Sequence, residues 1–460
     1  MERLRGLDTA FLYAETPSNH MHVAWAAILD TRSSPDAVDR GRLAELIGSR
    51  LDRLPALRKR LANPRLGYTQ PDWITVEVDP ADHIVVHDTA DLDAVAAEVL
   101  SSPLDRRRPL WEMHVVTPLG DGRAGLIMKL HHAVLDGPSG AELMVQLLDT
   151  APTPTPVTSQ SAPLRYDTTP TRADLTDVAR RRAAHGAARA AAGVRQVADV
   201  AAATSRWDRT HPAEAAHLPS RAPRTPFNRP VTARRTIRSL SVPLDRIDDL
   251  RRGTDSTVND AVLAITGGAL RRYLRRHRSL PITPLVALVP TSLRRGQQIA
   301  GGGNRTSALY TTLGTDISDP TTRLAEVTRV MNTAKRRHDE AGLGSLVQLT
   351  DLVPPRAAQT LTRLASRIQL SAWSPLAFNI VVSNVPGPDI PLYCNGAVVE
   401  SAVPMGPVTD WSAINITVVS YRRQLVFGVV VCPDVVPDVD AVVNDLLAEL
   451  EVQRLAPVTS

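Results

Sequence analysis

The chain has 460 residues, of which 43% are hydrophobic and 22% are charged, and it carries a net charge of +5 at pH 7. This composition is that of a globular protein and excludes disordered, collagen-like and coiled-coil classes. The length exceeds what one hydrophobic core usually supports, so it predicts two domains. The positive charge is modest and the arginines are not interleaved with aromatic residues, so we expect no nucleic-acid partner.

The cysteine content and the N-terminus indicate the compartment. Cys394 and Cys432 are the only cysteines, which predicts no disulfide framework and fits a reducing cytoplasm. Residues 1–9 mix charged and apolar side chains and lack the apolar core of a signal peptide. No segment has the roughly 18 continuous apolar residues of a membrane span. We therefore expect a cytoplasmic protein that meets any membrane from the side.

The first part of the chain, residues 1–150, is predicted to form one domain of helices and strands. Gly120, Asp121 and Gly122 have the composition of a turn and separate two mostly apolar runs, which predicts a β-hairpin. The predicted helices cover residues 37–60, 92–100 and 140–148, and the predicted hairpin strands cover residues 111–116 and 125–132.

Residues 151–225 are predicted to link two domains. Residues 151–170 are rich in Thr, Pro and Ser, which disfavours both helices and sheet interiors. Residues 174–203 are rich in Ala and Arg and are predicted to form a long helix whose apolar and basic faces are poorly separated. Two interpretations stay open: a solvated helix that packs between the domains, or a helix whose basic residues around 180–195 lie on a membrane surface.

The second domain is predicted over residues 226–460. Strands and helices alternate there without strict periodicity, which favours a mixed β-sheet flanked by helices in each half, an α/β (mixed α+β) fold. The predicted strands begin near Val231 and cover residues 284–290, 307–313, 377–383, 413–421 and 425–432, and the predicted helices cover residues 258–276 and two segments within 321–368.

The most informative motif is His131-His132-Ala133-Val134-Leu135-Asp136-Gly137 at the end of a predicted strand. Successive side chains of a strand point to opposite faces, so only one histidine of the pair can face a given cavity. An imidazole has an unperturbed pKa of about 6.5 and can accept a proton near neutral pH. The motif therefore predicts a general base at this strand end, with Asp136 available to orient the site and Gly137 to leave space for a substrate.

Other chemistries have less support. The opposite directions of His131 and His132 disfavour a shared metal ion, and His83 and His87 are predicted to lie on one strand roughly 13 Å apart, too far for one metal. The sequence has no GxSxG nucleophile motif and no GxxxxGK nucleotide loop. We therefore expect no metal and no cofactor, and a histidine that acts directly on a hydroxyl group.

The pattern HHxxxDG is typical of the chloramphenicol-acetyltransferase-like superfamily, and further segments resemble one branch of it, the bacterial wax ester synthase/diacylglycerol acyltransferases. The chain departs from the family at two places. Residues 410–417 lack the glycine that members of the family usually carry in the corresponding segment, and Cys432-Pro433 stands where an acidic residue is common. These departures bear on the choice of substrate more than on the chemistry. The resembling segments follow the family's order along nearly the whole chain, at residues 7–12, 15–17, 21–23, 109–112, 257–260, 268–271, 289–294, 382–388 and 391–393.

The resemblance implies two chloramphenicol-acetyltransferase-like domains with a tunnel between them. It implies that His132 is the general base, within the motif that Asp136 and Gly137 complete, and that Asn259 of the second domain donates a hydrogen bond to the oxyanion. We expect Asp136 to form an ion pair with Arg294. Residues with a substrate-binding or structural role at the site are then His131, Pro109, Leu110, Trp111, Asp260, Arg294, Ser383 and Asn384.

Several of these residues also have purely structural interpretations. Trp111 on a strand is more often a core residue than a substrate contact. Asn259 and Asp260 stand where a helix begins and fit helix capping equally well. Asn384 and the prolines that follow it have the composition of a rigid turn.

The implied activity is acyl-CoA-dependent O-acyl transfer to diacylglycerol or a long-chain fatty alcohol, with acyl-CoA as co-substrate. The acceptor, the acyl chain length and the oligomeric state are left open. The protein would contact the inner membrane or a lipid-droplet surface peripherally. Two alternatives are a condensation-type acyltransferase that uses a carrier-protein thioester, and a catalytically silent lipid-binding or lipid-droplet protein.

Overall fold

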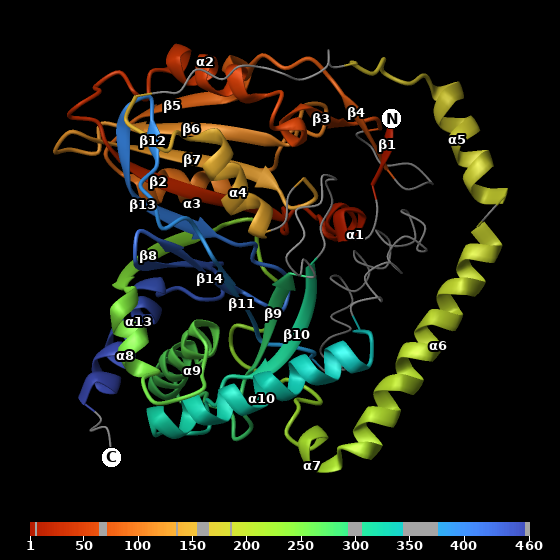
Figure 1. Cartoon of the computed structure of the whole chain (residues 1–460), viewed down its shortest axis with the longest axis vertical. Helices are drawn as coiled ribbons and strands as arrows, with labels where there is room; N and C mark the ends of the chain where they lie inside the picture. The colour runs from red at the N-terminus through yellow and green to blue at the C-terminus, as the bar shows by residue number, and fades with distance from the viewer. Residues whose placement is uncertain are drawn as a thin grey trace.

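The computed structural model describes residues 1–4, 7–63, 71–134, 137–153, 165–184, 186–292, 306–343 and 376–455. Two six-stranded sheets lie one above the other in Figure 1, each covered by helices. Within the described residues, no helix is both long and apolar enough to cross a bilayer.

The upper sheet is built mainly from the N-terminal half. Its strands are antiparallel neighbours except β5 and β6, which are parallel. α2 (Arg40–Arg50) and α4 (Gly137–Leu147) pack on one face, while α3 (Leu92–Ser101) packs on the other. The strand order is β12 (Tyr393–Cys394), β13 (Ala397–Met405), β2 (His22–Asp30), β7 (Arg123–His131), β6 (Trp111–Thr117) and β5 (Ile84–Asp88).

Smaller elements complete this half. α1 (Leu7–Ala14) precedes β2. A small three-stranded sheet has the order β1 (Glu2–Arg3), β4 (Asp72–Thr75) and β3 (Lys59–Leu61). Two 3-10 helices, η1 (Pro55–Arg58) and η2 (Pro80–His83), lie near these strands in the sequence. The helix expected over residues 37–60 is wrong in its extent. α2 ends at Arg50, and Pro55 then begins a 3-10 turn, because a proline cannot continue the helical hydrogen bonds.

The lower sheet belongs entirely to the C-terminal half. β11 runs parallel to both β9 and β14, and the remaining neighbours are antiparallel. The strand order is β10 (Thr306–Thr312), β9 (Val286–Ser292), β11 (Ile380–Val385), β14 (Ile414–Tyr421), β15 (Gln424–Val431) and β8 (Thr236–Pro243), and the associated helices are α8 (Leu244–Leu250), α9 (Val258–Arg276), α10 (Pro320–Glu340) and α13 (Val439–Leu455).

The two halves share a hydrophobic core, and one segment of the second half crosses into the upper sheet. β12 and β13 come from the C-terminal half but pair with β2, so residues 393–405 belong to the upper sheet. β13 also contacts β14 and β15 of the lower sheet. A Cβ atom added at Gly428 would lie 1.7 Å from the Pro404 carbonyl oxygen, so a glycine is required where β15 meets β13.

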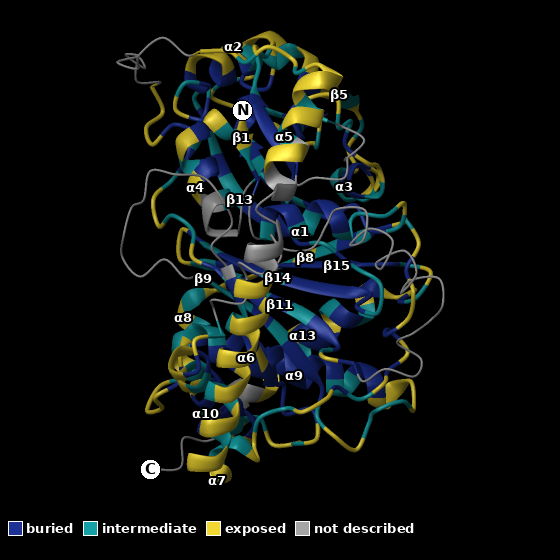
Figure 2. Cartoon of the chain, turned by 90° about the vertical axis from the view of Figure 1, so that its right-hand side faces the viewer, coloured by how far each residue is buried: buried dark blue, intermediate teal, exposed yellow. Residues whose placement is uncertain are grey.

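The linker helices form an exposed arm. α5 (Arg172–Ala184) and α6 (Gly186–Thr210) descend along the right-hand side of Figure 1 to α7 (Pro212–Ala215) at the bottom, and much of their surface is exposed in Figure 2. The described residues of the helix expected over 174–203 are all helical, in α5 and α6, and the helical segment continues to Thr210. Trp207 is buried, and Asp208 pairs with Arg337 of α10 at 2.8 Å, which anchors the lower end of the arm to the second half.

Candidate active site

The histidine pair lies where β7 ends. His131 is the last residue of β7, faces His22 across the sheet and is almost fully buried. His132 is half-buried, and its backbone N–H donates to the Met21 carbonyl oxygen at 2.9 Å. The His132 ring stacks on Phe11 of α1 with centroids 3.9 Å apart, whereas the His131 ring meets His22 edge-on. The two imidazoles therefore occupy different environments, as the alternation of a strand predicts.

His131 adjoins a partly buried ion pair between Glu15 and Arg106. Its Nε2 lies 3.2 Å from Oε2 of Glu15, and its Nδ1 accepts a hydrogen bond from the Ala133 amide at 3.0 Å. Arg106 donates from Nε to the same Glu15 oxygen at 3.1 Å. Burial raises the pKa of Glu15, but the contacts with His131 and Arg106 outweigh it, and the net pKa is lowered. Glu15 is therefore an anion beside the first histidine.

More ionisable side chains line the same sheet face. Lys129 is fully buried, with Nζ 2.7 Å from the Ser102 carbonyl oxygen and 3.2 Å from Oε2 of Glu112. Burial lowers the pKa of Lys129, and Glu112 opposes that shift. Burial also lowers the pKa of His22 well below its ordinary value, and the neighbouring charge of Lys129 lowers it further. His22 is therefore neutral near pH 7.

A small cavity opens at the junction of the halves, one residue from His132. It is lined by His20, Met21, His22, Leu100, Arg235, residues 406–408 and Val430. Arg235 is buried and donates hydrogen bonds to the carbonyl oxygens of Ser18 and Val408, one from each half. The cavity thus has an apolar and a basic wall beside the histidines.

The predicted Pro109, Leu110 and Trp111 support the fold of the site. Pro109 is buried, and the Leu110 carbonyl oxygen accepts from the His131 amide at 3.0 Å. Trp111 is 1% exposed, and its indole Nε1 donates to the Leu57 carbonyl oxygen at 2.9 Å. The geometry favours the core interpretation of Trp111, because its one polar atom is already satisfied inside the protein.

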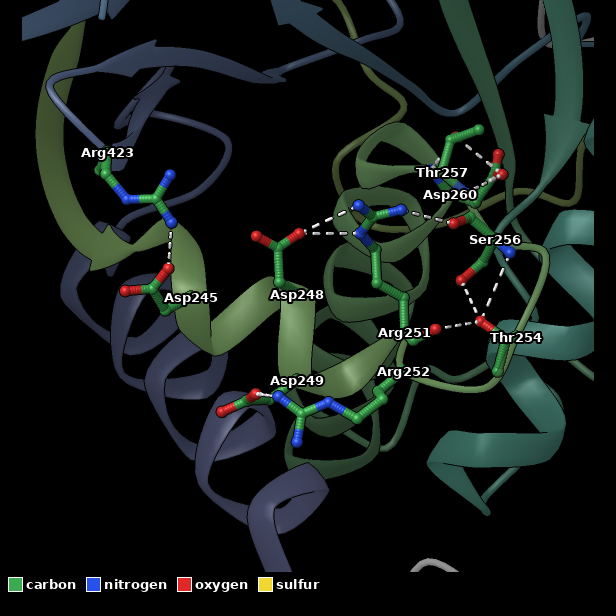
Figure 3. Close-up of polar contacts among 10 residues, drawn as sticks. All are labelled: Asp245, Asp248, Asp249, Arg251, Arg252, Thr254, Ser256, Thr257, Asp260 and Arg423. Atoms are coloured by element: carbon green, nitrogen blue, oxygen red, sulfur yellow. Dashed lines mark hydrogen bonds and ion pairs between the residues drawn. The ribbon is translucent and has the colours of Figure 1, made fainter.

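The predicted Asn259 and Asp260 lie in the first turn of α9 (Figure 3 shows the residues around it). Thr257 is the N-cap. The Asp260 carboxylate accepts from the backbone N–H and the hydroxyl of Thr257 at 2.9 and 2.8 Å, which completes a capping box. Asp260 therefore caps the helix, as the structural interpretation held. Asn259 is half-exposed beside it, and its role as oxyanion donor stays a prediction.

The remaining predicted residues are placed as follows. Ser383 and Asn384 are half-buried on β11 and pair with Thr417 and Val418 of β14. Beyond β11, a Cβ atom at Gly387 would lie 2.2 Å from the Ser420 carbonyl oxygen, so this turn needs a glycine for close approach. Gly137 begins α4. Asp136 and Arg294, and hence their expected ion pair, lie outside the described residues.

Sequence reasoning assigned no role to Phe11, Glu15, His22 or Lys129. Phe11 and Glu15 are four residues apart, a spacing that places side chains on one face of a helix. This spacing could be recognised in the sequence. The contacts with His131 and His132 could not, because those residues lie more than a hundred positions away and nothing in the local sequence indicates them.

Comparisons with known proteins identify this architecture. The model of the wax ester synthase/diacylglycerol acyltransferase catalytic domain matches residues 4–262, and that of the C-terminal domain of the same family matches residues 302–453. A wax ester synthase/diacylglycerol acyltransferase from Marinobacter aquaeolei VT8 superposes with a TM-score of 0.67 at 26% identity, over 98% of this chain and 99% of that chain. A trichothecene 15-O-acetyltransferase from Fusarium sporotrichioides shares the fold, with a TM-score of 0.61 at 12% identity, over 97% of this chain and 94% of that chain.

The two six-stranded sheets and the fold shared with these structures define a two-domain acyltransferase of the chloramphenicol-acetyltransferase-like class. Two Mycobacterium tuberculosis H37Rv proteins whose names propose diacylglycerol O-acyltransferase activity are similar in sequence. One is 32% identical, over 95% of this chain and 87% of its own length, and the other is 34% identical, over 97% and 98%. The chain belongs to the wax ester synthase/diacylglycerol acyltransferase family and is an O-acyltransferase.

Proposed function

We propose that the chain transfers an acyl group from acyl-CoA to a hydrophobic alcohol, with His132 as general base. The observation that carries the proposal is the position of His132: half-buried, stacked on Phe11, and bonded through its amide to Met21, which lines the cavity between the halves. We propose that a base in this position, next to a residue that lines the cavity, reaches a hydroxyl group that enters between the two sheets.

The reaction is one displacement in a ternary complex. His132 takes the hydroxyl proton as the alcohol oxygen attacks the thioester carbonyl carbon. The carbonyl oxygen becomes an oxyanion, for which Asn259 is the proposed donor. The carbon–sulfur bond then breaks, the imidazolium returns the proton to the departing thiolate, and ester and free CoA result. No acyl-enzyme forms.

The proposed acceptors are diacylglycerol or a long-chain fatty alcohol, since the family name and the mycobacterial relatives' names point to these two classes. Such acceptors are nearly insoluble in water, so the protein must reach a lipid phase. The exposed arm of α5 and α6 carries arginines and the exposed Val194 and Val197, and we propose that it lies on an anionic lipid surface, either the inner membrane or a lipid droplet.

The test is incubation with palmitoyl-CoA and a panel of alcohols that includes 1-hexadecanol and a 1,2-diacylglycerol, read by lipid chromatography. Ester should form with free acyl-CoA alone. A requirement for a pantetheinylated carrier protein would favour the condensation-type alternative, and well-folded protein that forms no ester under either condition would favour the lipid-binding one.

His132→Ala is the matched variant. General-base catalysis contributes about 10² to 10⁴ in rate, so ester formation should fall by at least 10²-fold while the melting temperature stays close to that of the wild type. A folded His132→Ala protein with undiminished turnover would contradict the assignment of the base.

A further inference from the structure

α1 and the residue that follows it contact both histidines of the pair. Phe11 stacks on the His132 ring, and Glu15, directly after the helix, lies 3.2 Å from Nε2 of His131. Phe11 and Glu15 are one helical turn apart, so they project from the same side of this segment. The N-terminal helix and the strand end are therefore joined at two neighbouring side chains.

The contacts of His131 define its tautomer. The Ala133 amide donates to Nδ1 at 3.0 Å, so Nδ1 must offer a lone pair and carries no proton. The proton of the imidazole then sits on Nε2, which lies 3.2 Å from Oε2 of Glu15 without hydrogen-bond alignment, so their interaction is electrostatic. Because a carboxylate accepts but does not donate, Glu15 stabilises this tautomer over the alternative with the proton on Nδ1.

The Glu15 carboxylate is itself held in place. Arg106 donates to it from Nε at 3.1 Å and donates to the Leu12 carbonyl oxygen at 3.3 Å from the same guanidinium group. Glu15 and Arg106 are only 12% and 23% exposed, so water competes weakly for these bonds. The contacts with Arg106 and His131 keep the pKa of Glu15 low, and its negative charge is retained near neutral pH.

Three consecutive backbone amides around the proposed base have fixed acceptors. The His131 amide donates to the Leu110 carbonyl oxygen, the His132 amide to that of Met21, and the Ala133 amide to the His131 ring. The first two bonds link main-chain atoms. The third alone depends on the protonation of a side chain, so it is the one that Glu15 controls.

We propose that Glu15 is a positioning residue: it holds the Nε2–H tautomer of His131, whose Nδ1 fixes the Ala133 amide and so the orientation of His132. This inference rests on the proposed function of His132 as the base. Glu15 does not touch substrate. Its effect on catalysis passes through His131, which distinguishes it from a carboxylate that merely joins α1 to Arg106.

Substitutions that mimic one imidazole nitrogen at a time separate these roles. The shorter side-chain amide of His131→Asn can offer an acceptor near the position of Nδ1, and the longer one of His131→Gln can offer a donor near that of Nε2. We expect His131→Asn to keep kcat at least about tenfold above that of His131→Gln, since a misplaced catalytic group can cost on the order of 10²-fold. Equal losses in the two variants would contradict the role of the Ala133 bond.

The coupling between Glu15 and His131 is the decisive measurement. Glu15→Ala should lower kcat by about 10- to 100-fold with KM nearly unchanged, and Glu15→Gln, which keeps an acceptor, should recover most of the loss. In the His131→Asn background, Glu15→Ala should cost less than about twofold more, because the tautomer is no longer at issue. If the fold losses in kcat of the two single variants multiply in the double variant, the proposal is overturned. Glu15 would then only connect α1 to Arg106.

Two controls complete the experiment. Glu214→Ala removes a carboxylate that pairs with Arg336 far from the histidines, and kcat should not change. In protein labelled with ¹⁵N-histidine, the His131 signals, identified by their loss in His131→Asn, should show the Nε2–H tautomer in the wild type and a mixture in Glu15→Ala. If His132→Ala is inactive while Glu15→Ala has wild-type kcat, the positioning role alone fails; if His132→Ala is active, the proposed function fails first.

Discussion

The two six-stranded sheets bury ionisable side chains in different places. In the upper sheet they lie on the sheet face itself, where His22, Lys129 and His131 project toward α3 and the junction of the halves. In the lower half the buried charges lie in the helical layer, where Arg323 of α10 and Arg272 of α9 both reach Glu449 of α13. On the described strands of the lower sheet, the buried polar side chains are uncharged ones such as Ser307, Thr311 and Asn415.

This difference suggests that the buried charges of the lower half are structural and that those on the upper sheet are placed for catalysis. Arg323 and Glu449 are nearly inaccessible and satisfy each other, so they join three helices without being available to a ligand. The upper group includes His22, which burial keeps neutral near pH 7 and which lines the cavity beside the proposed base. The charges in the helical layer of the lower half should therefore matter for stability, and those on the face of the upper sheet for catalysis and for pH dependence.

The largest expected effect tests the lower half. Glu449→Ala leaves the buried Arg323 guanidinium without its carboxylate, which should cost about 3–5 kcal/mol in the free energy of unfolding. Chemical denaturation measures this loss, and kcat per folded molecule should stay within about twofold of the wild type. A large fall in kcat with an unchanged unfolding midpoint would break the division between the halves.

The junction of the sheets should be the next most sensitive place. In Gly428→Ala the added methyl group would overlap the Pro404 carbonyl oxygen, so β13 and β15 must move apart, at a cost of about 1–3 kcal/mol. Gly253→Ala is a poor control because its φ is positive, whereas Gly140→Ala adds a methyl group into open space within α4 and should raise stability by up to about 1 kcal/mol. Equal unfolding midpoints for the Gly428 and Gly140 variants would show that the halves do not depend on this contact.

The pH dependence of stability should come from the upper half. Burial lowers the pKa of His22 well below 6.5, so below that pH the unfolded chain binds a proton that the folded chain does not. Stability is therefore greatest above pH 6.5 and falls as the pH decreases, by about 1.4 kcal/mol from this residue at one unit lower. His22→Gln should remove that increment in denaturation curves at pH 7.5 and 5.5, whereas His217→Gln, at an exposed site, should leave the slope unchanged.

Elements that local sequence specifies could be predicted closely. The helix expected over residues 258–276 has those bounds in α9, since Thr257 and Asp260 form its capping box. The hairpin of β6 and β7 follows from Gly120, Asp121 and Gly122, all of which adopt positive φ. The general position of the histidine pair at a strand end was predictable for the same reason: a strand and a turn are local features.

Features that depend on distant pairing could not be predicted in this way. β13 pairs with β2, as in Val399 opposite Leu29, and nothing in either strand identifies its partner. The same holds for Glu15, whose partners Arg106 and His131 are brought together only by the fold. The sequence could suggest a candidate base, but the side chains that contact the histidine pair are brought together only by the tertiary structure.

The smallest effect on stability is expected in the arm, which is neither sheet nor core. Arg180, Arg181 and Arg195 are exposed, so replacing all three by glutamine should change the free energy of unfolding by no more than about 0.5 kcal/mol. Binding to anionic vesicles should change much more, because each basic side chain near an anionic surface contributes about 1 kcal/mol and its charge is screened over about 10 Å in 0.1 M salt. Co-sedimentation of the triple variant with anionic vesicles should therefore weaken at least tenfold and resemble that of the wild type in high salt.

A second triple variant, with glutamine at Arg32, Arg234 and Arg252, is the control. It removes the same charge from exposed sites outside the arm and should bind as the wild type does. If both triple variants bind equally, net charge rather than the arm attracts the protein to lipid, and if neither differs from the wild type, α5 and α6 only connect the two halves.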